Sequence, residues 1–326
     1  MEKLVKLLKV HGSENKFFIL DQTLLETPLN DHELKKLAIN LCQNVLNGAD
    51  GLLVVDSSER CLGKMRVINA DGSEAKMCGN GLRTVSRYLA EKYQLTHFKV
   101  ETMESNLEVS QAEDFYPGVP AFSVEISPIS FEKTALPFSY HNLDKMVDQM
   151  VPEFLPDQSF TAVAVPNPHL ISFVPEVSQL ELGDLGHRLN EPNEYFPEGV
   201  NVSFCQILFN NKLFVQTYER GVGFTNACGT GMSATSLIFA LLHPDRFDSG
   251  KDITVYNPGG MVKTQITLNK ENPETSTIRL IGNATFTHEI EVPEFALHNN
   301  DLSDLSVANT GEEKAYQDFV ASIAES

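Results

Sequence analysis

The sequence, 326 residues long, lacks long apolar runs and has few basic residues. Its longest apolar run, residues 234–242, has about half of the ~20 residues that a membrane-spanning helix needs. The N-terminal residues alternate lysine with apolar side chains and contain neither the apolar core nor the cleavage site of a signal peptide. The 25 basic residues are outnumbered by 44 acidic ones, and a net charge of −19 repels phosphate backbones. We therefore expect a cytoplasmic protein that binds neither membranes nor nucleic acids.

Cysteine is also scarce. The five cysteines are an odd number spread over the chain without a C-x-x-C pair, so neither a disulfide framework nor a zinc site is indicated. Reduced thiols in a cytoplasm fit this usage. What is present is a globular composition, with 42% hydrophobic and 21% charged residues, and a length that suits two domains of about 150 residues each.

Hydrophobic periodicity predicts an alternating α/β chain. Helices are expected over residues 31–47, 79–93 and 229–242. Strands are expected over residues 16–21, 51–56, 64–69, 98–101, 106–111, 121–126, 162–165, 203–209 and 213–218. The polar, proline-containing stretch between residues 128 and 157 is interpreted as a linker and insertion.

The chain repeats itself at an offset of 150 residues. At this offset Met77-Cys78-Gly79-Asn80-Gly81 falls on Ala227-Cys228-Gly229-Thr230-Gly231, and the expected helices that follow also align. A duplicated unit of this size predicts a pseudo-twofold protein with a ligand site in the cleft between its halves.

Each C-G-x-G motif is expected to place a cysteine at the start of a helix. Unpaired N–H groups and the helix dipole favour the thiolate there, and they also suit a carboxylate ligand. Two proton-transfer groups on opposite faces of one carbon would invert its configuration: one thiolate removes the α-proton and the other thiol returns a proton. The alternative is that Cys78 and Cys228 are small apolar residues at buried helix starts. Cys42, Cys61 and Cys205 lack such glycines and are interpreted as packing residues.

The motifs resemble those of the diaminopimelate epimerase family. The first signature is Asn69-Ala70-Asp71-Gly72-Ser73-Glu74 followed by the Cys78 motif, and the second is Tyr218-Glu219-Arg220-Gly221 followed by the Cys228 motif. Further motifs are similar to those of the family and occur in the same order along the chain: His11-Gly12 with Asn15, Asn167-Pro168-His169, Asn201 and Pro258-Gly259-Gly260. The resemblance covers about residues 5 to 292 of the sequence.

The resemblance implies a fold of the α+β type, with two pseudo-twofold domains that each wrap a mixed, largely antiparallel sheet around a central helix. It implies interconversion of LL- and meso-diaminopimelate, on the route to lysine and peptidoglycan, by a homodimer that uses neither pyridoxal phosphate nor metal. Cys78 and Cys228 would be the acid/base groups, and His169 and Glu219 would tune their pKa values. Substrate contacts would come from Asn15, Asn69, Gly79, Asn80, Asn167, Asn201, Glu219, Arg220, Gly229 and Thr230.

The expected domains are residues 1–129, completed by a returning strand at 278–292, then residues 130–277, and an acidic extension at 293–326. The segment from residue 289 onward carries nine carboxylates against Lys314 as its single basic residue, and is interpreted as a solvated appendage.

The chain departs from the family at Glu14, Lys16, Gly51 and Phe224. Glu74 lies four residues before Cys78, and Phe224 holds the matching position before Cys228. Because a nearby carboxylate disfavours a thiolate by like-charge repulsion, we expect Cys228 to be the more acidic thiol. A racemase of another amino acid and a non-catalytic relative remain alternative functions.

Overall fold

The computed structural model describes residues 3–324, and the chain divides into two compact units. The first consists of Met1–Val124 and Gly282–Ser326, and the second of Glu125–Ile281. Residues 1–2 and 325–326, at the ends of the expected first half and of the expected acidic extension, lie outside the described part. Within residues 3–324, no helix combines the length and the apolar character needed to cross a membrane.

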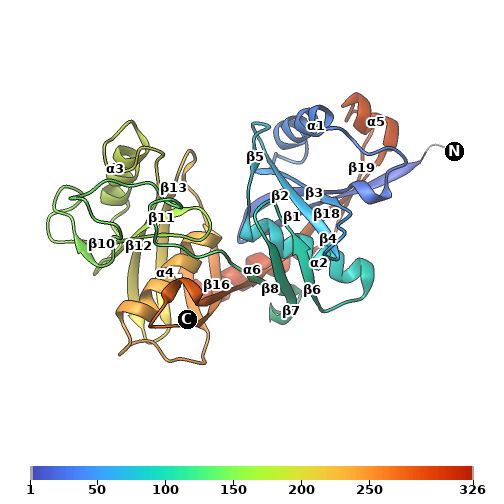
Figure 1. Ribbon diagram of the computed structural model, residues 1–326. Helices are drawn as coiled ribbons and strands as arrows, with labels where there is room; N and C mark the ends of the chain where they lie inside the picture. Colours follow the sequence, from blue (N-terminus) through green and yellow to red (C-terminus); the bar gives the residue numbers. More distant parts are fainter. Residues whose placement is uncertain (1–2, 325–326) are drawn as a thin grey trace. The chain divides into compact units, whose positions relative to one another are not determined.

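The first unit contains a mixed, mostly antiparallel sheet (Figure 1). Its strands are β1 (Leu4–Gly12), β2 (Asn15–Asp21), β3 (Gly51–Asp56), β4 (Gly63–Asn69), β5 (Glu74–Ala75), β6 (His97–Glu101), β7 (Asn106–Tyr116), β8 (Val119–Glu125), β18 (Thr285–Pro293) and β19 (Ser306–Asn309). The pairs β2–β3 and β4–β6 are parallel. The pairs β1–β2, β3–β4, β4–β5, β6–β7 and β7–β8 are antiparallel, as are β1–β18 and β18–β19.

The second unit repeats this order of pairings. Its strands are β9 (Gln149–Met150), β10 (Ser159–Ala164), β11 (Pro168–Phe173), β12 (Asn201–Phe209), β13 (Lys212–Glu219), β14 (Gly223–Phe224), β15 (Ile253–Asn257), β16 (Gly260–Thr267) and β17 (Thr277–Asn283), the last of which ends just beyond the boundary of the unit. The parallel pairs are β11–β12 and β13–β15, which correspond to β2–β3 and β4–β6. The antiparallel pairs β10–β11, β12–β13, β13–β14 and β15–β16 match the first unit one by one. The offset of 150 residues therefore corresponds to a duplicated topology.

A central helix forms the core of each unit. The structure confirms both expected bounds, because α2 spans Gly79–Tyr93 and α4 spans Gly229–Leu242. In α4 every residue from Gly229 to Ala240 is buried, and in α2 the buried residues run from Gly79 to Arg87 and include Leu89 and Ala90. A helix that is buried on all sides must be surrounded by other elements, which is the arrangement expected for a sheet curved around it.

The other helices of these topologies cover one side of each sheet. Helix α1 (Asp31–Asn44) ends three residues earlier than expected and buries Leu34, Leu37, Ala38, Leu41 and Cys42, the 3–4 spacing of an amphipathic helix. Asn30 caps it by accepting from the N–H groups of His32 and Glu33. In the second unit α3 (Gln179–Asn190) has the corresponding place between β11 and β12.

The segment between β8 and β10, interpreted from the sequence as a linker and insertion, packs on the second unit. It is largely irregular, but it buries a row of apolar side chains in the core of the second unit, namely Leu136, Phe138, Tyr140, Met146, Val151 and Phe154. The rings of Phe154 and Phe160 lie 5.4 Å apart in an edge-to-face contact. Each apolar anchor is separated from the next by other residues at irregular spacing, which hides the periodicity of a buried segment.

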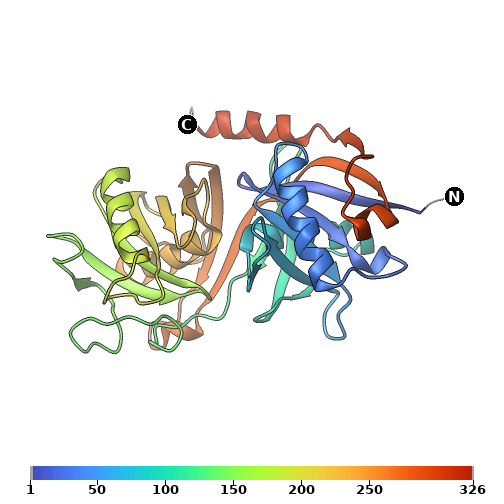
Figure 2. The same cartoon turned by 90° about the horizontal axis from the view of Figure 1, so that it is seen from above.

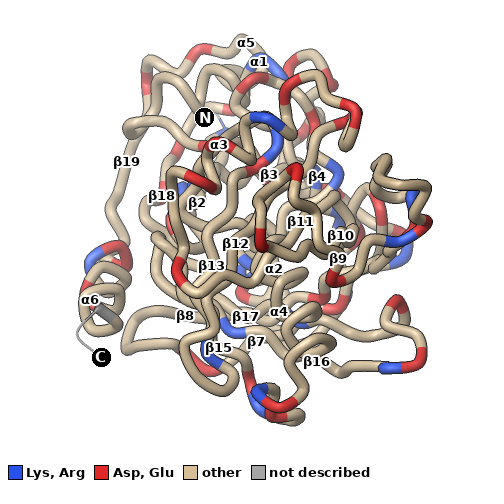
Figure 3. The backbone as a smooth tube through the Cα atoms, turned by 90° about the vertical axis from the view of Figure 1, so that its left-hand side faces the viewer, with Lys and Arg blue, Asp and Glu red and all other residues tan. Residues whose placement is uncertain are grey.

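The acidic C-terminal segment is not a solvated appendage. It contains α5 (Glu294–Asn299), β19 and α6 (Glu312–Ala324), the red helix at the end of the chain in Figure 2. Tyr316 is fully buried and Phe319 is 3% exposed, so α6 packs on the first unit through an apolar face. Its acidic residues are visible along the same helix in Figure 3. The acidic composition predicted a solvated segment, but burial of the Tyr316 and Phe319 side chains stabilises the packing of α6 while its exposed carboxylates stay in water.

Candidate active site

The first cysteine motif forms the N-terminal cap of α2. Cys78 is half-buried with extended backbone, and its sulfur accepts from the Gly81 N–H at 3.4 Å. A Cβ atom at Gly81 would lie 2.8 Å from a Leu53 methyl group and 3.6 Å from the Cys78 sulfur. The second glycine of the motif therefore lets the sulfur sit over the first turn of the helix, where N–H groups stabilise negative charge.

Asn15 and Asn80 lie beside this thiol. The Asn15 Oδ1 atom is 3.7 Å from the Cys78 sulfur and accepts from Asn80 Nδ2 at 3.3 Å. Asn15 Nδ2 donates to a carboxylate oxygen of Asp50 at 2.7 Å, which fixes the orientation of the amide. The carbonyl oxygen of Asn15 is thus directed at the thiol, where it orients the thiol proton.

Asn69 lies at the end of β4 and is held by a turn. Its Nδ2 donates to Ser73 Oγ at 2.9 Å, and its backbone N–H donates to the Ser73 carbonyl at 2.8 Å. Of the expected substrate residues in the first unit, Asn15 contacts the Cys78 sulfur and Asn80 donates to Asn15, whereas the Asn69 side chain donates within its own turn.

A buried arginine lies behind the first cysteine motif. Arg83, five residues after Cys78, is fully buried in α2 and donates to the Asn283 carbonyl at 3.2 Å and to Ser13 Oγ at 3.2 Å. Burial lowers the pKa of Arg83 to about 10, which leaves the side chain charged at neutral pH. Its electrostatic partners are the Cys78 thiol and the Tyr316 phenol. A positive charge at this place favours the thiolate form of Cys78.

The second cysteine motif repeats the cap in the second unit. Cys228 caps α4, and its sulfur accepts from the Gly231 N–H at 3.4 Å. Burial raises the pKa of the Cys228 thiol well above its usual range, and the adjacent Glu219 carboxylate raises it further. Both causes oppose the helix N–H groups, so Cys228 is protonated at neutral pH.

His169 is linked to Cys228 through a hydroxyl group. Its Nε2 atom lies 3.1 Å from Thr230 Oγ1, which in turn lies 3.6 Å from the Cys228 sulfur. Burial lowers the pKa of His169 to about 3, with nearby Arg220 as a second cause, so the imidazole is neutral. The parallel pairing of β11 and β12 sets His169 opposite Asn201.

The remaining expected residues of the second unit lie around β12 and β13. Asn201 is buried, donates to the Pro168 carbonyl at 2.8 Å and accepts from the Arg220 N–H at 2.9 Å, so its amide organises the backbone. The Arg220 guanidinium donates to the Glu198 carbonyl at 3.1 Å. The Glu219 carboxylate accepts from the Thr225 hydroxyl. Among the described residues, the buried Oδ1 atom of Asn167 has no hydrogen-bond partner.

The expected order of thiol acidity rests on wrong premises. Glu74 is engaged by Arg66 through two hydrogen bonds of 2.8 and 2.9 Å, so its charge is compensated. Phe224 packs its ring edge-to-face on Tyr218 at 5.4 Å. At Cys228, burial is the larger cause of the raised thiol pKa and the Glu219 carboxylate is the second. Both causes count against the expectation that Cys228 is the more acidic of the two thiols.

Several residues near the thiols were not anticipated from the sequence. Asp50 orients Asn15, and Arg83 brings a buried charge behind Cys78. The Ser203 and Thr217 hydroxyls, 2.8 Å apart, lie beneath Gly231. No sequence pattern indicated the burial of Arg83, because Asn80, Ser86 and Arg87 lie on the same helix face. The other residues depend on strand register.

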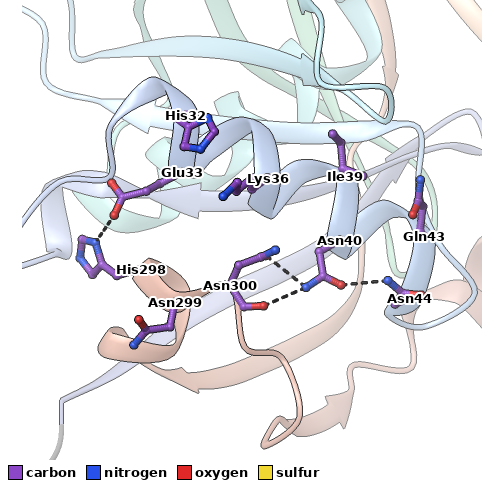
Figure 4. Close-up of a pocket in the computed structure, with 10 residues that line it drawn as sticks. All are labelled: His32, Glu33, Lys36, Ile39, Asn40, Gln43, Asn44, His298, Asn299 and Asn300. Carbon is purple, nitrogen blue, oxygen red and sulfur yellow. Dashed lines mark hydrogen bonds and ion pairs between the residues drawn. The ribbon is translucent and has the colours of Figure 1, made fainter.

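A pocket of about 500 Å³ lies elsewhere in the first unit, between α1 and α5 (Figure 4). It is crossed by a Glu33–His298 ion pair of 3.0 Å and by hydrogen bonds from Asn40 to Asn300. It contains none of the expected site residues. Across residues 3–324, no three or more His, Cys, Asp and Glu side chains gather in a way that could hold a metal ion.

Comparison with known proteins agrees with the duplicated cysteine motif. The family model described as "Diaminopimelate epimerase" matches residues 7–120 and 161–287. A protein of Lactiplantibacillus plantarum named diaminopimelate epimerase is 49% identical, with 98% of this chain and 99% of the relative covered. Proteins of the same name from Ligilactobacillus salivarius and Enterococcus faecalis are 48% and 47% identical, each with 98% of this chain and 99% of the relative covered.

Solved structures of lower sequence identity share the fold. A PhzF-family phenazine biosynthesis protein of Bacillus anthracis superposes with a TM-score of 0.62 at 16% identity, covering 89% of this chain and 99% of that one. A hydroxyproline epimerase of Agrobacterium vitis superposes with a TM-score of 0.55 at 15% identity, covering 89% and 91%. The matched family model and the near full-length relatives together show that the chain belongs to the diaminopimelate epimerase family.

Proposed function

We propose that the protein is an isomerase that interconverts LL- and meso-diaminopimelate by moving one α-proton between two thiols, without a cofactor. The observation that carries the proposal is the pair of cysteine caps on corresponding central helices, with each sulfur 3.4 Å from an N–H group of its own helix. The names of the relatives supply the substrate.

The two thiols have different roles in each direction of the reaction. Burial and Glu219 keep Cys228 protonated, so it is the acid when Cys78 supplies the thiolate. Cys78 removes the α-proton from one face of the carbon, and Cys228 donates its proton to the other face. The enzyme is left with Cys78 protonated and Cys228 ionised, which is the state that catalyses the reverse reaction. The proposal requires both sulfurs to reach the same α-carbon.

The difficult step is the formation of negative charge next to a carboxylate. We propose that backbone N–H groups at Gly79, Asn80, Gly229 and Thr230 bind the reacting carboxylate, because fixed dipoles in a dry site stabilise that charge without reorganising. His169 contributes as a neutral group that orients the Thr230 hydroxyl toward Cys228.

The far end of the substrate distinguishes diaminopimelate from simpler amino acids. We propose that Arg220 binds the distal carboxylate through its planar guanidinium, and that Asn15, Asn69, Asn167 and Asn201 supply amide contacts. The buried Oδ1 atom of Asn167, which has no hydrogen-bond partner among the described residues, supports this assignment because it can accept from a substrate ammonium group. The internal bonds of Asn201 favour a supporting role for that residue.

Proton NMR in D2O tests the proposal directly. LL-diaminopimelate incubated with the protein is expected to equilibrate with the meso form and to incorporate one deuterium at the inverted carbon. Lysine, which lacks the distal carboxylate, is expected to exchange very slowly. Equal turnover of lysine would instead favour a racemase of broader specificity, and no exchange with either compound would contradict an epimerase.

We further propose that the protein works in the cytoplasm as a homodimer, on the route to lysine and peptidoglycan. The five cysteines, all within residues 3–324, form no disulfide, which fits a reducing compartment. Light scattering of the purified protein tests the dimer, and restoration of growth in a bacterial strain that requires diaminopimelate tests the pathway.

A further inference from the structure

The C-terminal segment lies beyond the part of the chain matched by the family model, which ends at residue 287. In the first unit its helix α6 contacts β18 and β7. Two independent anchors hold it there. Glu312 accepts from both terminal nitrogens of Arg87 at 2.6 and 2.7 Å, and the Tyr316 side chain is fully buried. The neighbouring carboxylate, Glu313, is not needed for either anchor.

Glu313 contacts a buried histidine instead. Its Oε2 atom is 3.1 Å from Nε2 of His11, which is 1% exposed. The other ring nitrogen, Nδ1, accepts from the Glu14 N–H at 3.2 Å. Because a backbone N–H can only donate, Nδ1 carries no proton, so the ring proton is on Nε2, the nitrogen that lies 3.1 Å from the Glu313 carboxylate. The Tyr316 ring packs edge-to-face against the imidazole at 4.6 Å. The Glu14 N–H thereby sets the tautomer of His11, and Glu313 and Tyr316 hold the orientation of its ring.

The histidine in turn holds the turn that leads to the first thiol. Ser13 and Glu14 both have left-handed backbone, with φ of 54° and 63°. Two consecutive non-glycine residues in this region cost about 1–2 kcal/mol each and need support from their surroundings. Ser13 receives it from Asn283, which accepts from the Ser13 N–H at 2.7 Å, and Glu14 receives it from His11. The next residue is Asn15, whose Oδ1 lies 3.7 Å from the Cys78 sulfur.

We propose that Glu313 is a positioning residue for the first thiol: it fixes His11, which fixes the Ser13–Glu14 turn, which holds Asn15 against Cys78. The C-terminal extension is then part of the first half of the active site and acts through the β1–β2 connection. The expected effect of Glu313 on turnover rests on the proposed function.

The test replaces Glu313 in the full chain. Glu313→Ala removes the acceptor for His11, whereas Glu313→Gln keeps an oxygen that can accept from Nε2–H. The control is Asp318→Ala, which removes a half-exposed carboxylate of the same helix that pairs with the exposed Lys314. For each variant we would measure kcat and KM for epimerisation, circular dichroism, and the rate of iodoacetamide labelling of Cys78 and Cys228 by peptide mass spectrometry.

With Glu313→Ala, kcat is expected to fall about tenfold while KM changes less than about threefold, because a thiol that has lost its orienting amide transfers its proton more slowly while the other substrate contacts are kept. Cys78 is expected to be labelled at least about threefold faster, since it loses the amide that covers it and accepts a hydrogen bond from the thiol. Cys228 labelling and circular dichroism should stay unchanged, and Glu313→Gln and Asp318→Ala should match the wild type.

Unchanged kcat and Cys78 labelling in Glu313→Ala would overturn the inference. So would equal changes at both cysteines, which indicate general loosening, or a Glu313→Gln variant as impaired as Glu313→Ala. Labelling needs no substrate. If the wild type fails to turn over diaminopimelate, the proposed function is wrong, and the labelling comparison still decides the role of Glu313.

Discussion

The second glycine of each cysteine motif offers a matched pair of perturbations. In Gly231→Ala the new Cβ would lie 2.8 Å from Thr217 Oγ1, 3.2 Å from Ser203 Oγ and 3.2 Å from the Cys228 sulfur. In Gly81→Ala it would lie 2.8 Å from a terminal methyl group of Leu53 and 3.6 Å from the Cys78 sulfur. The leucine methyl group is the end of a flexible side chain and can rotate away. The two hydroxyls beneath Gly231 are hydrogen-bonded to each other at 2.8 Å and come from adjacent strands, so they cannot both move.

The two free energies can be compared. Replacing glycine by alanine inside a helix stabilises it by about 1 kcal/mol, whereas adding a methyl group to a packed core costs about 1–3 kcal/mol. Gly81→Ala is therefore expected to change the free energy of unfolding by less than about 1 kcal/mol, and Gly231→Ala to lower it by about 1–2 kcal/mol. A shift of the Cys228 sulfur by a few tenths of an ångström should lower kcat by about tenfold, since a displacement of about 1 Å can cost about a hundredfold.

Thermal unfolding and the exchange of the substrate α-proton in D2O would measure both effects. Iodoacetamide labelling of the two cysteine peptides would locate the disturbance, which should appear at Cys228 in Gly231→Ala and be small at Cys78 in Gly81→Ala. The reasoning is refuted if Gly231→Ala is as stable and as active as the wild type, or if Gly81→Ala is the more damaging change.

Three further predictions follow from the same contacts. Cys78→Ala and Cys228→Ala should each abolish epimerisation and leave circular dichroism unchanged; a variant that keeps about a tenth of the wild-type rate would exclude its cysteine as one of the two bases. Iodoacetamide should label Cys78 at lower pH than Cys228, because burial raises the pKa of Cys228, and Glu219→Gln should shift the Cys228 profile to lower pH. The hydrogen bond from His11 lowers the pKa of the Glu313 carboxyl to about 2 from its usual 4.5, so its stabilising effect is present above pH 4.5 and is lost as the pH falls toward 2. The difference in melting temperature between the wild type and Glu313→Gln should therefore shrink over this range, and a constant difference would contradict the assignment.

Local sequence signals were sufficient where structure is decided within a few residues. The bounds of α2 and α4 could be predicted because the C-G-x-G motif starts a helix and the apolar run after it has helical length. The strands β3 and β4 are short apolar runs bounded by turn residues, and their predicted limits differ from the observed ones by at most one residue. The duplication was visible because both helix starts keep the same residues at the same spacing.

Contacts between distant segments could not be predicted in this way. The acidic tail is held by Tyr316 and Phe319, and the segment before β10 is held by isolated aromatic residues, neither of which produces a periodic pattern. The pairing of Asp50 with Asn15 depends on the parallel register of β2 and β3. The effect of a carboxylate on a thiol pKa depends on whether a cation already compensates its charge, as Arg66 does for Glu74. No sequence pattern indicates such a pairing.

The differences between the two halves carry as much mechanistic meaning as their likeness. Ser86 and Ser236 occupy matching positions of the central helices and both donate to the carbonyl four residues earlier. At the matching positions of Arg83 and Ser233, however, one half has a buried charge and the other a hydroxyl that donates to the Gly229 carbonyl. A two-base reaction needs one ionised and one protonated thiol at the start of each turnover. Two identical halves would ionise their thiols equally; in the proposed mechanism, the cation behind Cys78 and the carboxylate beside Cys228 would both place the first proton on Cys228.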